Sequence, residues 1–159
     1  MNQAEHIGKI LTEKNMTIST AESCTGGLLS SKLTDISGSS AYITLNLVTY
    51  ANEAKMKMLG VEGSILNTKG AVSEECAYQM AKGLYKISGS DICVSTTGIA
   101  GPTGGTSEKP VGLMYSCIYT PDKYEIYKIL KPSNTPRIQM KELFCEEVLG
   151  NIIRFIEIN

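Results

Sequence analysis

The sequence has very little histidine, no tryptophan and no clustered cysteine. Of its 159 residues one is a histidine, His6, and the five cysteines are widely spaced without a Cys-x-x-Cys pair. A zinc site needs clustered cysteine and histidine ligands, so we expect no metal. A Ser–His catalytic pair is also disfavoured, because His6 lies in a predicted N-terminal helix, far in sequence from the motifs described below.

A surplus of charge and a long apolar run are also missing. The chain has fifteen Lys and Arg residues and sixteen Asp and Glu residues, for a net charge of -1. Without a basic surplus we expect no nucleic-acid partner. No apolar run reaches the roughly 18 residues of a membrane span, and the polar N-terminus has no signal-peptide core. We therefore expect a cytoplasmic protein that does not associate with membranes.

Hydrophobic periodicity predicts helices alternating with strands. Residues with apolar side chains at helical spacing predict helices at 4–14, from 25 onward, at 52–60, at 73–87 and at 135–158. Runs rich in β-branched, aromatic or continuous apolar residues predict strands at 17–21, 41–51, 91–101, 113–120 and 123–130. This order favours a three-layer α/β protein, with helices on both faces of a mixed sheet.

The stretch "STAESCTGGLLSSKL", residues 19–33, places small polar residues and two glycines at a strand-to-helix junction. A helix start leaves backbone N–H groups free, and glycines allow close approach. Such a turn can bind an anion or a developing oxyanion, with a hydroxyl placed to attack a carbonyl. The alternative is an ordinary helix start capped by Ser23 or Thr25.

The stretch "VTYANEAK", residues 48–55, leads from a strand into a helix for which Asn52 is a plausible N-cap. Lys55 lies in the first turn, where a cation opposes the helix dipole. A partly desolvated lysine near positive backbone dipoles has a lowered pKa and can act as a general base. The alternative is a solvated lysine.

The stretch "TTGIAGPTGGTSEKPVG", residues 96–112, is a glycine-rich loop after the presumed central strand. Ligands of open α/β sheets lie beyond the carboxyl ends of strands, where glycine-rich loops expose N–H groups to phosphates. The alternative is a plain surface loop. Because Ser–Lys pairs replace Ser–His pairs in some hydrolases, Ser23, Tyr50 and Lys55 would form a site if their strands are neighbours.

Together these segments resemble the CinA C-terminal domain family, and within it the PncC-like nicotinamide mononucleotide (NMN) deamidases. The resemblance spans roughly residues 5–155 and rests on "TAESCTGGLL", "SGSSAYI", "VTYANEAK", "LGV", "GAVSEE", "TGIAGPTGG" and "EKPVG". It implies a single domain over 1–159 without the larger N-terminal domain of full-length members. The implied fold is a three-layer α/β/α sandwich with a mixed, mainly parallel five-stranded sheet, found as a homo-oligomer (dimer or higher).

The same resemblance implies an amidohydrolase that converts NMN and water to nicotinate mononucleotide and ammonia without a cofactor or metal. It implies Ser23 as nucleophile, Tyr50 and Lys55 as its catalytic partners, and Arg137 as the phosphate ligand. The further substrate-binding residues that we expect are Cys24, Thr25, Gly26, Gly27, Thr97, Gly98, Ala100, Gly101 and Gly104. We expect Ser23 to face the pocket, Cys24 to pack inward and Thr25 to cap the helix.

The chain departs from the family pattern at a few positions. Thr103 stands where an aspartate is usual, "SNTPR" replaces the usual approach to the last helix, and Lys141 stands where arginine is more usual. These departures motivate an alternative function, a catalytically weak nucleotide-binding or interaction module that uses the same loops without turnover.

Overall fold

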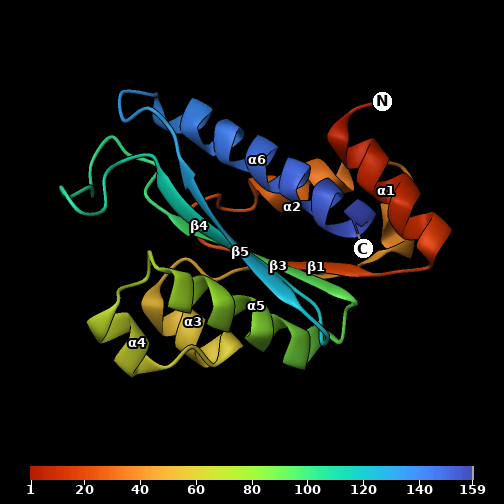
Figure 1. Ribbon diagram of the computed structural model, residues 1–159, viewed down its shortest axis with the longest axis horizontal. Helices are drawn as coiled ribbons and strands as arrows, with labels where there is room; N and C mark the ends of the chain where they lie inside the picture. Colours follow the sequence, from red (N-terminus) through yellow and green to blue (C-terminus); the bar gives the residue numbers. More distant parts are fainter. Residues whose placement is uncertain (159) are drawn as a thin grey trace.

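A five-stranded sheet forms the centre of the protein, in a computed structural model that describes residues 1–158 (Figure 1). The strands are β1 (Ile18–Glu22), β2 (Ile43–Val48), β3 (Ile92–Gly98), β4 (Leu113–Tyr119) and β5 (Tyr124–Leu130). Their order is β2-β1-β3-β4-β5; β1 pairs in parallel with β2 and β3, and β4 pairs antiparallel with β3 and β5. Only β4 therefore runs against the others, which confirms the predicted mixed, mainly parallel five-stranded sheet.

Helices cover both faces of the sheet, so the three-layer architecture is also confirmed (Figure 1). One layer contains α1 (Gln3–Lys14), α2 (Leu28–Thr34) and α6 (Arg137–Ile158), and the other contains α3 (Asn52–Leu59), α4 (Gly63–Thr68) and α5 (Glu74–Ser88). A 3-10 turn, η1 (Ser39–Ala41), precedes β2. The sequence analysis missed α4, a six-residue helix with no side-chain cap, because so short a segment carries little periodicity.

Three clusters of buried apolar residues lie between the layers, and two of them are large cores. The larger one lies between the sheet and the α1, α2 and α6 layer and includes Ile7, Leu29 and Phe144, which are fully buried. The smaller one includes Met80 and Leu84 of α5 on the opposite face. β3 lies between the two cores and is buried along its length up to Gly98, as its nearly continuous apolar sequence predicts.

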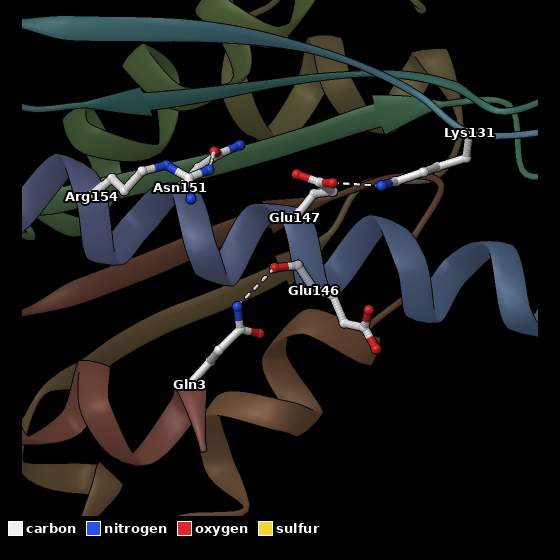
Figure 2. Close-up of polar contacts among 6 residues, drawn as sticks. All are labelled: Gln3, Lys131, Glu146, Glu147, Asn151 and Arg154. Carbon is white, nitrogen blue, oxygen red and sulfur yellow. Dashed lines mark hydrogen bonds and ion pairs between the residues drawn. The ribbon is translucent and has the colours of Figure 1, made fainter. Parts of the chain in front are cut away.

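The middle of helix α6 contacts the start of α1 and the segment after β5 (Figure 2). The Gln3 side chain donates a hydrogen bond to the carbonyl of Glu146 at 3.2 Å, and Lys131, just after β5, pairs with Glu147 at 2.5 Å. Within residues 1–158, neither α6 nor any other helix is long and apolar enough to cross a bilayer.

The carboxyl ends of β1, β2 and β3 meet at one edge of the sheet, because these three strands are parallel. Glu22 at the end of β1 lies opposite Val48 at the end of β2. The Ser23 turn, the Tyr50 segment and the glycine-rich loop follow these strand ends. The topology thus collects the three sequence motifs in one place.

Candidate active site

The amine of Lys55 contacts the hydroxyl of Ser23. The Nζ–Oγ distance is 2.9 Å, and the side chains are only 1% and 8% exposed, respectively. Ser23 directly follows β1, and Lys55 lies near the start of α3, which follows β2. The parallel pairing of the two strands therefore brings together two residues that are 32 positions apart.

The Lys55 amine donates to three oxygens. Its Nζ lies 2.9 Å from the Ser23 hydroxyl and from the carbonyls of Thr49 and Tyr50. Burial lowers the pKa of Lys55, and the neighbouring thiols of Cys76 and Cys24 offset this only in part. An ammonium has three N–H donors, which match these three oxygens. When the amine loses the proton directed at Ser23, its lone pair faces Oγ and can accept the hydroxyl proton.

A buried carboxylate that the sequence analysis did not single out organises the turn after β1. Glu22 is 0% exposed. Its Oε1 accepts from the Thr25 hydroxyl at 2.6 Å and from the amides of Gly27 and Leu29 at 3.2 and 2.9 Å. Its Oε2 accepts from the amide and hydroxyl of Ser30 at 3.0 and 2.6 Å. Glu22 thus caps α2 from the preceding strand.

This arrangement corrects the expected helix starts. Gly27, not Thr25, occupies the N-cap position of α2, at a φ of 101° that favours glycine, and the Thr25 hydroxyl is bound to Glu22. At α3 the N-cap is Ala51, and the side chain of Asn52 makes no cap hydrogen bond. The cap was therefore predicted two residues too early at α2 and one residue too late at α3, although α3 itself begins at Asn52 as predicted.

The backbone amides of the turn have different partners. The Gly26 amide donates within the turn and the Gly27 amide donates to Glu22. Those of Cys24 and Thr25 have no oxygen acceptor among residues 1–158. These two amides, rather than all four of the expected segment, are therefore the candidates for binding an oxyanion.

Cys24 packs into the larger core, as expected from the neighbouring position of Ser23. It is 6% exposed. Burial, with the nearby charge of Glu22, raises the pKa of the thiol to about 12. A thiolate is the reactive form of cysteine, so Cys24 is chemically quiet at neutral pH.

Tyr50 contributes to the site differently from the expected relay. Its carbonyl accepts from Lys55 at 2.9 Å and lies 3.4 Å from the Ser23 hydroxyl. Its side chain is 59% exposed, and the phenol oxygen accepts from Arg137 Nη2 at 3.0 Å. The residue orients the Ser–Lys pair through its backbone, and a phenol relay to Ser23 is not the arrangement present.

Arg137, the first residue of α6, bridges this region to the glycine-rich loop. Its Nη1 donates to the Gly101 carbonyl at 2.6 Å while Nη2 binds Tyr50. Lys141, one turn later, lies beside the Ser23 turn. A Cβ placed on Gly26 would be 3.3 Å from its Nζ. Two cations therefore flank the Ser23 turn.

Several expected binding residues of the glycine-rich loop instead serve packing. The Thr97 hydroxyl is buried and donates to the Ala71 carbonyl at 2.7 Å, and Ala100 lies in the larger core. A Cβ on Gly98 would be 2.7 Å from the Leu113 carbonyl oxygen. The side-chain positions of Thr97, Gly98 and Ala100 are thus used for packing, so contacts of these residues with a ligand would have to come from the backbone.

The two remaining expected glycines of the loop differ in their surroundings. Gly101 has a φ of 80°, and a Cβ there would be 2.4 Å from Val111 Cγ1, so the position requires glycine. Its carbonyl holds Arg137. Gly104 is exposed and has a φ of 94°. The part of the loop open to a ligand is therefore its exposed tip around Gly104.

The comparisons with known proteins agree with the motifs. A family model described as the CinA C-terminal domain matches residues 1–156. The chain belongs to the CinA C-terminal domain family. A CinA-like protein of Chloroherpeton thalassium is 49% identical over 152 residues, covering 94% of this chain and 36% of that protein. One of Chlorobium limicola is 47% identical over 158 residues, covering 96% and 36%.

A solved structure of the CinA family has the same fold. The competence/damage inducible protein CihA from Agrobacterium tumefaciens superposes with a TM-score of 0.92 at 39% identity, covering 96% of this chain and 92% of that one. The present chain spans about a third of the length of the two CinA-like relatives. The names of these relatives specify no reaction, so the chemistry is argued from the site.

Proposed function

We propose that this chain is an amidohydrolase that converts NMN and water to nicotinate mononucleotide and ammonia. The observation that carries the proposal is the 2.9 Å contact between the Ser23 hydroxyl and the buried amine of Lys55. A hydroxyl needs a base to become a nucleophile, and a desolvated lysine can supply it. The choice of NMN rests on the resemblance of the motifs to the PncC-like deamidases.

The proposed reaction has two half-reactions. Neutral Lys55 takes the Ser23 proton while Oγ attacks the carboxamide carbon, and the amides of Cys24 and Thr25 bind the oxyanion. The protonated Lys55 then gives its proton to the carboxamide nitrogen, and the C–N bond breaks. Ammonia leaves, and the acyl group remains on Ser23 as an acyl-enzyme. Water attacks the acyl group, its proton passes to Lys55, and the ester bond to Ser23 breaks as Oγ recovers the proton.

The flanking cations support a phosphorylated substrate. Arg137 uses one N–H of each terminal nitrogen on Gly101 and Tyr50. A guanidinium has five N–H donors, so others remain for a phosphate. Lys141, beside Gly26, adds a second positive charge. The ribose phosphate of NMN would lie between these side chains and the loop tip.

The decisive experiment measures ammonia release from NMN by the wild-type chain, with nicotinamide, nicotinamide riboside and NAD as comparison substrates. Ser23→Ala is the matched control, because it removes only the nucleophilic oxygen. We expect turnover of NMN by the wild type and none above background by the variant. Binding of NMN by both proteins without ammonia release would instead support the nucleotide-binding module.

We further propose that the enzyme works in the cytoplasm as a homo-oligomer, as the family resemblance implies. Light scattering on the purified chain tests the oligomeric state. A monomer at the concentrations used for the activity assay would refute the oligomer without affecting the proposed chemistry.

A further inference from the structure

We infer that Glu22 is a positioning residue of this reaction, one that holds the turn after β1 so that the amides of Cys24 and Thr25 stay free and ordered for the oxyanion. The inference rests on the proposed function, because it assigns Glu22 to the same Ser23 chemistry. It goes beyond helix capping, which would require only that amides at the start of α2 be satisfied.

The first argument is the number of donors that Glu22 collects. All five come from a six-residue segment, 25–30, and they include two hydroxyls that a helix start does not need to satisfy. No ion pair to Glu22 is present among residues 1–158. A carboxylate without a cation is costly to bury unless hydrogen bonds compensate it, so the side chain and the turn are mutually dependent.

The second argument is that Glu22 joins the turn to the sheet. Its backbone lies in β1 opposite Val48, and its carbonyl accepts from the Thr49 amide at 2.8 Å. Thr49 in turn accepts from Lys55 through its own carbonyl. The backbone of Glu22 thus binds the end of β2, which holds Lys55. Its side chain binds the turn that carries Ser23.

The third argument concerns the two free amides. The Thr25 hydroxyl is held by Glu22 at 2.6 Å and by the Thr96 hydroxyl at 2.8 Å, and the Gly27 amide is directed toward Glu22. These contacts fix the chain on the C-terminal side of the free amides, and the Ser23 amide, bound to the Thr96 carbonyl at 3.1 Å, fixes the other side. Preorganised donors stabilise an oxyanion without reorganisation during the reaction.

The test compares Glu22→Gln with Ser95→Ala. The glutamine keeps the size of the side chain but replaces one acceptor oxygen with an NH₂ donor, which cannot accept from the Ser30 amide. Ser95→Ala removes a buried hydroxyl that bonds the Ala77 carbonyl and the Cys117 amide, away from the turn. It therefore controls for a general loss of stability.

Three quantities are measured for each variant at a temperature where it is folded: thermal stability, kcat and KM for NMN, and the rate at which a fluorophosphonate labels Ser23. For Glu22→Gln we expect kcat and the labelling rate to fall by about 10- to 100-fold while KM stays within about twofold. For Ser95→Ala we expect kcat and labelling within about twofold of wild type despite lower stability.

A destabilised Glu22→Gln with wild-type kcat and labelling would reduce Glu22 to a helix cap and overturn the inference. If Glu22→Gln does not fold, Ser30→Ala replaces it, with an expected fall in both rates of about 3- to 10-fold at unchanged KM; unchanged rates would again overturn the inference. Labelling does not need NMN. If the wild type is labelled at Ser23 but inactive on NMN, only the choice of NMN as substrate is refuted. If Ser23 is not labelled, both its role as nucleophile and the positioning role of Glu22 are refuted.

Discussion

Replacing Lys55 with methionine tests the proposed base most directly. The side chain is 1% exposed and lies between the end of β2 and the Ser23 turn. Methionine has a similar length and flexibility, so it can occupy the same space. The variant removes the amine, and with it the contacts to Ser23, Thr49 and Tyr50.

The expected loss of activity follows from the role of the amine. A positioned general base contributes about 10²- to 10⁴-fold to the rate, so kcat for NMN should fall by at least about 10²-fold. The kcat of Lys55→Arg should fall by as much, because a guanidinium does not give up its proton at accessible pH. KM should change little, since Lys55 contacts Ser23 and two backbone carbonyls rather than the loop or Arg137.

The stability of the same variant depends on pH in a direction set by the lowered pKa of Lys55. The unfolded chain, with a lysine pKa of about 10.4, binds the proton more strongly than the folded one. Wild-type stability therefore rises with pH from the folded pKa up to about 10.4, with a slope of at most about 1.4 kcal/mol per pH unit. Lys55→Met lacks this contribution, so its stability relative to wild type is greatest at low pH.

The measurements are ammonia release at several pH values and urea denaturation of both proteins over the same range. Wild-type kcat should rise with pH as Lys55 loses its proton. The reasoning is refuted if Lys55→Met keeps more than about a tenth of wild-type kcat, a smaller loss than any general base would give. Parallel stability–pH curves for the two proteins would refute the lowered pKa.

Three further predictions concern the phosphate, the thiol and the helix packing. Arg137→Ala should raise KM for NMN by about 10- to 100-fold, from charge-assisted bonds of about 1.5–3 kcal/mol, and reduce the preference over nicotinamide riboside; an unchanged preference in steady-state kinetics would place the phosphate elsewhere. Cys24→Ala should keep most activity, and iodoacetamide should inactivate the wild type slowly, because burial raises the thiol pKa to about 12; stoichiometric inactivation that NMN prevents would make Cys24 the nucleophile. Gly83→Ala would place a Cβ 1.8 Å from the Leu59 carbonyl oxygen, so the free energy of unfolding, measured with urea, should drop by about 3 kcal/mol, and an unchanged value would show that α3 and α5 can separate at little cost.

The sequence predicts the elements well where the signal is local. Ser73 caps α5 by accepting from the Cys76 amide at 3.1 Å, as its position before two glutamates indicates. The strand limits at β1, β3, β4 and β5 agree to within a few residues. The start of α2 was wrong because its cap comes from Glu22, a strand residue six positions before the first helical residue. No local capping pattern places the capping side chain so many residues before the helix.

The candidate site likewise contains residues that the sequence singles out and one that it does not. Ser23 and Lys55 are conspicuous in the sequence, because a hydroxyl at a glycine turn and a lysine in the first turn of a helix are unusual placements. The order of helices and strands then predicts that parallel strand ends meet. The sequence does not single out Glu22, because a polar residue at the end of a strand is ordinary. Its role becomes visible only from its 0% exposure and the five donors to its carboxylate.

By itself, then, the sequence determined the order of the elements apart from α4, the three motifs and the candidate Ser–Lys pair, all of which depend on neighbours along the chain. Tertiary structure alone decided that Lys55 is desolvated, that burial raises the pKa of the Cys24 thiol, and that the Tyr50 phenol faces Arg137 rather than Ser23. Burial and pKa depend on groups that surround a side chain in space, and here these come from β1, β2, β3, α3, α5 and α6. Their combined effect exists only after the parallel strands have brought those elements together.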